Sequence, residues 1–149
     1  MPARQLTPMD YVTDYLQTQI ENRQKVVVNN FIYVGETCIR EARLNGTYQD
    51  RTGNLRSSIG YVVLRDGVSI NQSGFEQVLA GTDGSKSGKE FIQALIAKHR
   101  KGIVLIVVAG MEYAAYVEAL NYDVLTSAEL LAERMVPQLM VKLGFKVAA

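Results

Sequence analysis

The feature that most constrains the fold is a helical pattern of apolar residues running from Pro8 to Leu44. Its first members recur at spacings of three and four residues and so share one helix face: Met9, Val12, Leu16 and Ile20. At 1.5 Å per residue an unbroken helix would be roughly 55 Å long, more than the width of a domain of this size. Part of it must project from the body or pack against another subunit.

The middle of this pattern also fits a different structure. Val26 to Val28 and Phe31 to Val34 flank Asn29-Asn30, a dipeptide that tolerates left-handed geometry, so a short β-hairpin is an alternative. A helical face nevertheless continues through the segment: Val27, Phe31, Val34 and Cys38. We therefore favour a helix, in which the polar run 21–25 could form a kink, with Thr7 as its N-cap and Asn45-Gly46 as its stop.

The stretch from Arg51 to Ser58 separates this helical region from strands. Gly53-Asn54 is a turn dipeptide, and Ile59–Leu64 is apolar, β-branched and aromatic, as in a strand. The residues that follow, Arg65-Asp66-Gly67, predict a tight turn into a second strand, Val68–Ile70. A β-hairpin is expected here.

Residues 72–101 are predicted to form an insertion outside the sheet. Three glycines at 81, 84 and 88 should loosen the chain before a short amphipathic helix, Lys89–Arg100. Its inward face is expected to consist of four apolar side chains: Phe91, Ile92, Leu95 and Ile96.

The last third of the chain begins with its most apolar stretch, Ile103–Ala109. This β-branched run is expected to be the central strand, buried on both faces. A short helix at Glu112–Leu120 and a short edge strand at Tyr122–Leu125 should follow. Ser127 is expected to cap a final helix through about Leu143, which Pro137 should bend or divide.

These elements predict an α+β fold in a single domain, residues 1–149, after a loose N-terminus at 1–7. It would have a long N-terminal helix, a small, mostly antiparallel sheet of about four strands, and a C-terminal helix packed on the sheet. The composition, 48% hydrophobic and 21% charged, is that of an ordinary globular domain.

The sequence offers little for catalysis, and we expect no catalytic, cofactor or metal site. Cys38 is the only cysteine and lies on an apolar helix face, as a core residue would, and His99 is the only histidine. The segment Gly81–Glu90 resembles a phosphate-binding loop only superficially. Asp83 stands where its first glycine is needed, and Glu90 stands where its hydroxyl is needed.

Charge and hydropathy limit the expected partners. The net charge is +1, so any DNA contact should be incidental and confined to a basic cluster, which we interpret as a solvated face: Lys86, Lys89, Lys98, Arg100 and Lys101. No apolar run reaches about 18 residues and the N-terminus lacks a signal-peptide layout, so we expect neither membrane contact nor export.

Two segments carry a resemblance to a known family. Residues 50–59 read Asp-Arg-Thr-Gly-Asn-Leu-Arg-Ser-Ser-Ile, and residues 107–118 read Val-Val-Ala-Gly-Met-Glu-Tyr-Ala-Ala-Tyr-Val-Glu. In this order, between a long first helix and a last helix, they resemble the head-tail connector family of tailed bacteriophages. These are the neck or tail-completion proteins, also called minor tail components. The resemblance covers the chain from about Pro8 to Leu143.

The resemblance implies a non-catalytic virion structural protein, assembled in the bacterial host cytoplasm. It would form a homo-oligomeric ring that joins head to tail and contacts other neck and tail proteins. The motif residues implied in assembly are Thr52, Gly53, Asn54, Leu55, Arg56, Ser57, Ser58, Tyr113, Ala114, Tyr116, Val117 and Glu118. Among them, Arg56 and Glu118 are expected to order the turn or pair across subunits. Leu55, Tyr113, Tyr116 and Val117 are expected in the core.

The sequence also departs from the family pattern. Many members follow the glutamate with Gly-Thr and later have Arg-Pro-Phe, whereas Glu118 is followed here by Ala-Leu-Asn-Tyr-Asp-Val-Leu-Thr. The segment 72–101 is also long. These differences leave the subunit contacts and ring size open. The alternatives are a tail terminator or head-side adaptor of the same machine, and a small DNA-binding adaptor.

Overall fold

The computed structural model describes residues 8–44, 53–75, 79, 81–111, 114 and 123–145. In these residues the helices and strands, in chain order, are α1 Met9–Leu44, α2 Asn54–Ser57, β1 Ile59–Arg65, β2 Val68–Gly74, α3 Thr82–Ile96, β3 Ile103–Ala109 and α5 Thr126–Lys142. The α+β class is confirmed. The described sheet has three strands rather than about four.

The N-terminal pattern forms one helix of 36 residues, so the hairpin around Asn29-Asn30 is wrong. The β-branched residues Val28, Val34 and Ile39 do not make a strand because they are buried on one side of the helix in the core cluster, and such packing outweighs intrinsic propensity. The helix ends at Leu44. The predicted N-cap Thr7 and the stop Asn45-Gly46 lie outside the described residues.

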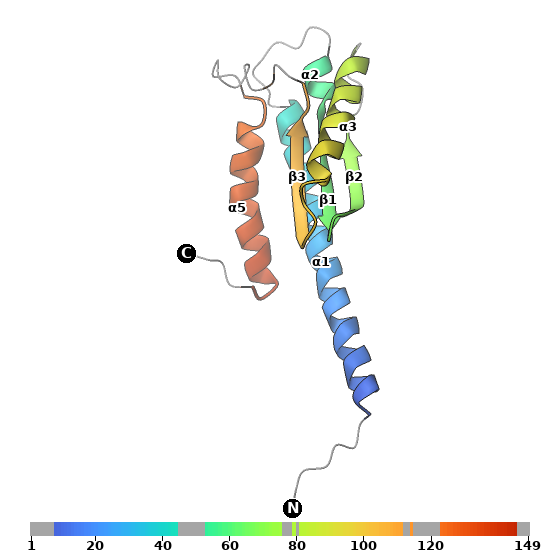
Figure 1. The fold of residues 1–149 in the computed structure, drawn as a ribbon. Coiled ribbons are helices and arrows are strands. Elements are labelled where there is room, and N and C mark those ends of the chain that lie inside the picture. The colour runs from blue at the N-terminus through green and yellow to red at the C-terminus, as the bar shows by residue number, and fades with distance from the viewer. Residues whose placement is uncertain are drawn as a thin grey trace, which may run out of the picture.

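The elements form three layers (Figure 1). α1 packs against β1 and β3 on one face of the sheet and also contacts α5, while α3 packs against the same two strands. The two helix layers contact different side chains of β1. Ile59, Tyr61 and Val63 belong to the cluster under α1, whereas Val62 and Leu64 belong to the cluster under α3. The core is therefore divided by the sheet.

The central strand is β1, not β3 as predicted. The described sheet has the order β2-β1-β3, and β1 pairs antiparallel with both neighbours. Six of the seven residues of β1 are buried, whereas most of β3 is half-buried. Both strands are apolar because helices cover both sheet faces. An apolar sequence therefore indicates that both faces of a strand are covered, but it does not indicate whether the strand has one or two neighbouring strands.

The hairpin between β1 and β2 closes at Asp66 and Gly67, as predicted. Their φ values are 52° and 84°, which matches a two-residue turn with both central residues in the left-handed region. The second strand extends to Gly74, beyond the predicted end at Ile70. Residues 72–74 thus belong to the sheet.

A buried tyrosine joins α1 to both strands of this hairpin. The Tyr61 hydroxyl donates to Glu36 Oε1 at 2.8 Å and accepts from Asn71 Nδ2 at 2.8 Å. Its ring packs on Gly35, where an added Cβ would lie 2.5 Å from Tyr61 Cδ2. Burial, followed by the hydrogen bond and charge of Glu36, raises the pKa of Tyr61.

Helix α3 starts at Thr82, not at Lys89 as predicted. Gly84 and Gly88 lie inside this helix and are buried, so they do not loosen the chain. A Cβ at Gly84 would overlap the carbonyl oxygen of Asn54, and one at Gly88 would lie 2.5 Å from the Phe75 ring. The glycines let α3 approach the neighbouring backbone closely. The prediction that Phe91 faces inward is wrong, because this residue is 47% exposed.

The C-terminal helix has nearly the predicted bounds but a different cap. Ser127 lies within its first turn, and its hydroxyl oxygen is buried with no hydrogen-bond partner in the described structure. Its backbone N–H donates instead to Asp123 Oδ1 at 3.1 Å. The helix continues across Pro137 to Lys142, so Pro137 does not end it.

Two further predictions fall wholly or partly on residues that the structure does not describe. Of the predicted edge strand Tyr122–Leu125, residues 123–125 are not a strand, and Tyr122 lies outside the described residues. The predicted helix Glu112–Leu120 also lies outside them, apart from Ala114.

Replacement of Gly84 by Ala should destabilise the protein by about 1–3 kcal/mol, because the new methyl group overlaps backbone that cannot rotate away. Helix propensity alone would predict a gain of about 1 kcal/mol, so the sign of the change is informative. Urea unfolding measures it. Lys86→Ala, at an exposed position of the same helix, is the control. Stabilisation by Gly84→Ala would contradict the close approach.

Tyr61 should make stability fall at alkaline pH. A tyrosine whose folded pKa is raised contributes fully below its unfolded pKa of about 10, and this contribution is lost as pH rises above it. We expect Tyr61→Phe to flatten the loss of unfolding free energy as pH rises from roughly pH 10 to pH 12. Urea unfolding across this range, compared with the exposed Tyr15→Phe variant, tests this expectation. An unchanged slope in Tyr61→Phe would refute it.

Candidate functional site

The first sequence motif forms a junction between α1 and β1. Gly53 has a φ of 78°, in the left-handed region that favours glycine, and the single turn α2 follows it directly. The side chain of Asn54 reaches across to α3, where its Oδ1 accepts a hydrogen bond from the Gly84 N–H at 3.0 Å. We call residues 53–58 the junction. The junction thus connects α1, β1 and α3 within one helical turn.

Two arginines fasten the junction to the end of α1. Arg56 Nε donates to the Arg43 carbonyl oxygen at 3.2 Å, and Arg43 Nε donates to the Arg56 carbonyl oxygen at 3.3 Å. Both side chains are half-buried. Arg56 thus holds α2 against the last turn of α1. Its suggested pairing across subunits stays a prediction, as does that of Glu118, which lies outside the described residues.

The second motif meets the first at the same end of the sheet. The Gly110 N–H donates to the Ser58 carbonyl oxygen at 3.1 Å. Ala114 packs with Leu55 and Val124 in one apolar cluster. The fold therefore brings together motifs that are about fifty residues apart in the chain. Five of the motif residues implied in assembly lie outside the described residues: Thr52, Tyr113, Tyr116, Val117 and Glu118.

Burial indicates what the described motif residues do. Leu55 is 2% exposed, and Ser57 and Ser58 are fully buried. Ser58 Oγ donates to the Leu55 carbonyl oxygen at 2.7 Å, which satisfies its hydroxyl inside the protein. Side chains this deep are inaccessible to a partner, so their role is to shape the junction. A contact surface must be sought elsewhere.

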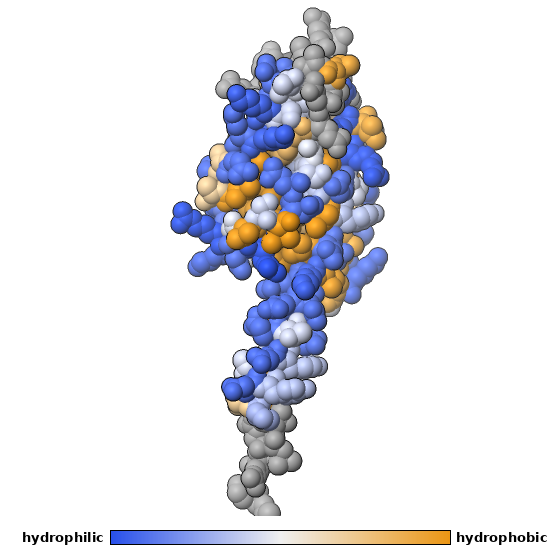
Figure 2. All heavy atoms as spheres, turned by 90° about the vertical axis from the view of Figure 1, so that its right-hand side faces the viewer, coloured by the Kyte–Doolittle hydropathy of each residue, from blue (hydrophilic) through white to orange (hydrophobic). Residues whose placement is uncertain are grey.

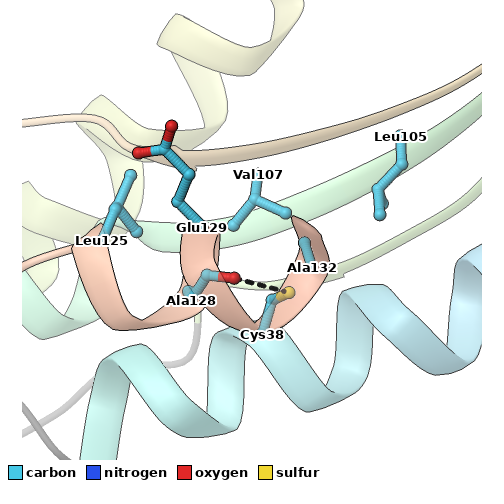
Figure 3. Close-up of a pocket in the computed structure, with 7 residues that line it drawn as sticks. All are labelled: Cys38, Leu105, Val107, Leu125, Ala128, Glu129 and Ala132. Carbon is cyan, nitrogen blue, oxygen red and sulfur yellow. Dashed lines mark hydrogen bonds between the residues drawn. The ribbon is translucent and has the colours of Figure 1, made fainter. Parts of the chain in front are cut away.

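An apolar cavity of about 300 Å³ lies between α1, β3 and α5 (Figure 3). It is lined by Cys38, Leu105, Val107, Leu125, Ala128, Glu129 and Ala132. Cys38 Sγ donates to the Ala128 carbonyl oxygen at 3.5 Å, while the Glu129 carboxylate points away from it. Burial, with the charge of Glu41 as a smaller cause, raises the pKa of Cys38. The thiol therefore stays protonated and unreactive at neutral pH, as befits a core residue.

The largest exposed feature is the N-terminal half of α1, which extends beyond the body of the molecule (Figure 1). We call Met9–Val26 the projecting segment. Its exposed apolar side chains are Met9, Tyr11, Tyr15, Leu16, Ile20 and Val26. Figure 2, seen from the right-hand side of Figure 1, shows apolar surface on the body, whereas the visible side of the projecting segment is largely hydrophilic.

A groove of about 430 Å³ lies where the projecting segment joins the body. We call it the base groove; its lining is Ile20, Arg23, Gln24, Val27, Phe31, Gly102, Ile103, Met140 and Phe145. Arg23 crosses from α1 to the C-terminal segment: its Nη2 donates to the Leu143 carbonyl oxygen at 2.7 Å, and its guanidinium carbon lies 4.7 Å from the Phe145 ring centroid. The groove is thus apolar inside, with a cation on one wall.

Beside this groove lies part of the predicted basic cluster. Lys98, Arg100 and Lys101 are exposed and belong to the loop that leads into Gly102 and Ile103 of the groove lining. His99 is exposed as well. Within the described ranges no group of three or more histidine, cysteine or acidic residues is placed to hold a metal ion. None of the helices described is long and apolar enough to span a membrane.

Sequence reasoning missed the glycines that hold α3 against the junction. An added Cβ at Gly81 would overlap the Ser57 side chain, and one at Gly110 would overlap Gly88. The available signal was the spacing of Gly81, Gly84 and Gly88, which places small residues on one helix face. Glycine's low helix propensity favoured a loop instead.

No protein-family model matches this chain, and no curated protein or solved structure matches it at a significant level. What can be said of its function therefore rests on its own geometry and on the two sequence motifs.

Replacement of Asn54 by Ala should cost about 1–3 kcal/mol, because the buried Gly84 N–H loses its acceptor. Asn54→Asp keeps an oxygen at the same place and should retain most of the stability. Urea unfolding of the two variants separates loss of the hydrogen bond from loss of the amide group. Equal destabilisation by Ala and Asp would show that the acceptor oxygen is not what matters.

Proposed function

We propose that this protein is a non-catalytic structural subunit of a tailed-bacteriophage virion, a neck or tail-completion protein that forms a ring joining head to tail. The observation that carries the proposal is the projecting segment. An exposed helix with six large apolar side chains on its surface is costly for an isolated molecule and useful for an assembling one. The two motifs that resemble the connector family add support.

The division between buried and exposed residues fits an assembly role. The motif residues described in the structure are buried or half-buried, while the surface that offers contacts lies on α1 and around the base groove. A contact between two different patches, repeated around an axis, closes into a ring. The neighbours would be other neck and tail proteins, and assembly would take place in the host cytoplasm.

One specific observation favours a second candidate. The exposed run Lys98, Arg100 and Lys101 offers cations to phosphates, as a small DNA-binding adaptor near the DNA exit would need. The net charge of +1 argues against DNA as the main partner. A tail terminator or head-side adaptor would use the same surfaces as a neck protein and differs from it only in neighbours.

Deletion of the gene from the encoding phage tests the proposal by negative-stain microscopy of lysates. We expect full heads lying apart from complete tails, and joined virions when the wild-type gene is supplied in trans. Joined virions without the gene would refute the joining role. Abnormally long tails would indicate a terminator, and empty heads would indicate a head-side adaptor.

The DNA-binding candidate has a separate test with purified protein. If DNA is a partner, a fluorescent duplex should bind with an affinity that falls steeply with salt, and Lys98→Glu with Lys101→Glu should remove the binding. Binding that the double variant leaves unchanged would place the DNA contact elsewhere.

A further inference from the structure

The projecting segment continues the core-facing stripe of α1 beyond the core. Met9, Leu16 and Ile20 precede Val27 and Val34 at spacings of seven, four, seven and seven residues, which keeps all five on one face of the helix. Val27 and Val34 are buried, whereas Met9, Leu16 and Ile20 are each more than half exposed. The same face is therefore covered by this chain at one end and uncovered at the other.

Helix stability gives a physical reason to expect a cover for the uncovered end. Most helical stability in proteins comes from packing of an apolar face, and short stretches without packing are marginal in water. The projecting segment contains β-branched residues and few strong helix formers near its start. Packing of its apolar face against a partner would supply the helix stability that the intrinsic propensity of its residues does not.

The charges of the chain indicate what that partner is. From Pro8 to Asn22 there are three acidic residues, Asp10, Asp14 and Glu21, and no lysine or arginine. The sheet end beside the base groove carries the opposite charge, on Lys98, Arg100 and Lys101. The nearby acid Asp66 accepts a hydrogen bond there from the Gly102 N–H at 2.9 Å. The acidic helix and the basic rim are complementary.

One molecule cannot bring these two surfaces together. α1 is continuous, so residue 10 lies about 25 Å along the helix axis from Val27, which packs at the body. The projecting segment also points away from the sheet (Figure 1). Its first turns can meet a basic rim only on a second copy of the chain.

We propose that the projecting segment of one subunit docks in the base groove of the next. Leu16 and Ile20 pack against the groove lining contributed by Ile103, Met140 and Phe145, while Asp10 and Asp14 face Lys98 and Lys101 of that neighbour. The contact joins two different patches, so it propagates from subunit to subunit and closes into a ring. It rests on the proposed ring-forming function and identifies the surfaces that would form the ring.

Sedimentation velocity of the purified full chain over a concentration series tests the apolar part of this contact. We expect the wild type to self-associate, and Leu16→Glu with Ile20→Glu to weaken association about a hundredfold or more, because charges would enter the apolar contact from the docking helix and, at Ile20, from the groove lining itself. The matched control is Thr18→Glu with Asn22→Glu. It adds the same charges at the same spacing elsewhere on the exposed helix and should associate nearly as the wild type does. Circular dichroism checks that both variants remain helical.

Charge reversal tests which surface receives the helix. Lys98→Glu with Lys101→Glu should weaken association about tenfold and reverse its dependence on salt, because salt would then screen a repulsion between like charges. Adding Asp10→Lys and Asp14→Lys to that variant should restore association, because the two reversed surfaces are again complementary. Restoration is expected only if these groups face one another.

Three outcomes would overturn the inference. The wild-type chain could stay monomeric at millimolar concentration, or the control variant Thr18→Glu with Asn22→Glu could weaken association as much as Leu16→Glu with Ile20→Glu does. The third outcome is that the variant with Lys98→Glu and Lys101→Glu associates like the wild type. The last result, with a disruptive stripe pair, would indicate direct pairing of projecting helices. Self-association through this contact, together with joined virions from a phage lacking the gene, would uphold the contact and refute only the joining function.

Discussion

The burial of β1 between two helix layers is the constraint on which the rest of the structure depends. Its alternate side chains face α1 and α3, so the strand needs a helix on each face and a strand on each side. This requirement fixes where α1 can lie along the sheet. Because α1 is longer than the sheet that it covers, its N-terminal half must extend past the body (Figure 1).

The second constraint is the close approach of the α3 backbone to the junction, at the end of the sheet away from the projecting segment. α3 lies on the junction through buried glycines, with the Asn54 side chain accepting the Gly84 N–H. The second motif joins through Gly110 and Ala114. These contacts fix the C-terminal end of α1 against α2, and α2 against α3.

Because of these two constraints, the residues that determine the fold differ from the residues that are available for contacts. The described residues of the two motifs are buried or half-buried, and the exposed apolar and charged groups lie outside the motifs. Substitution of the exposed groups can therefore change the contacts without changing the body that the motifs hold together.

The sequence by itself determined the elements whose signals are local. The helical face from Met9 to Leu44, the turn at Asp66-Gly67, the strand from Ile59 and the last helix are readable because periodicity and turn chemistry act between near neighbours. Tertiary structure decided the rest. Neighbours distant in sequence made β1 rather than β3 the central strand, placed Gly84 and Gly88 inside a helix, and brought the two motifs together at one end of the sheet. Each depends on which surfaces approach one another, and a local pattern does not encode that.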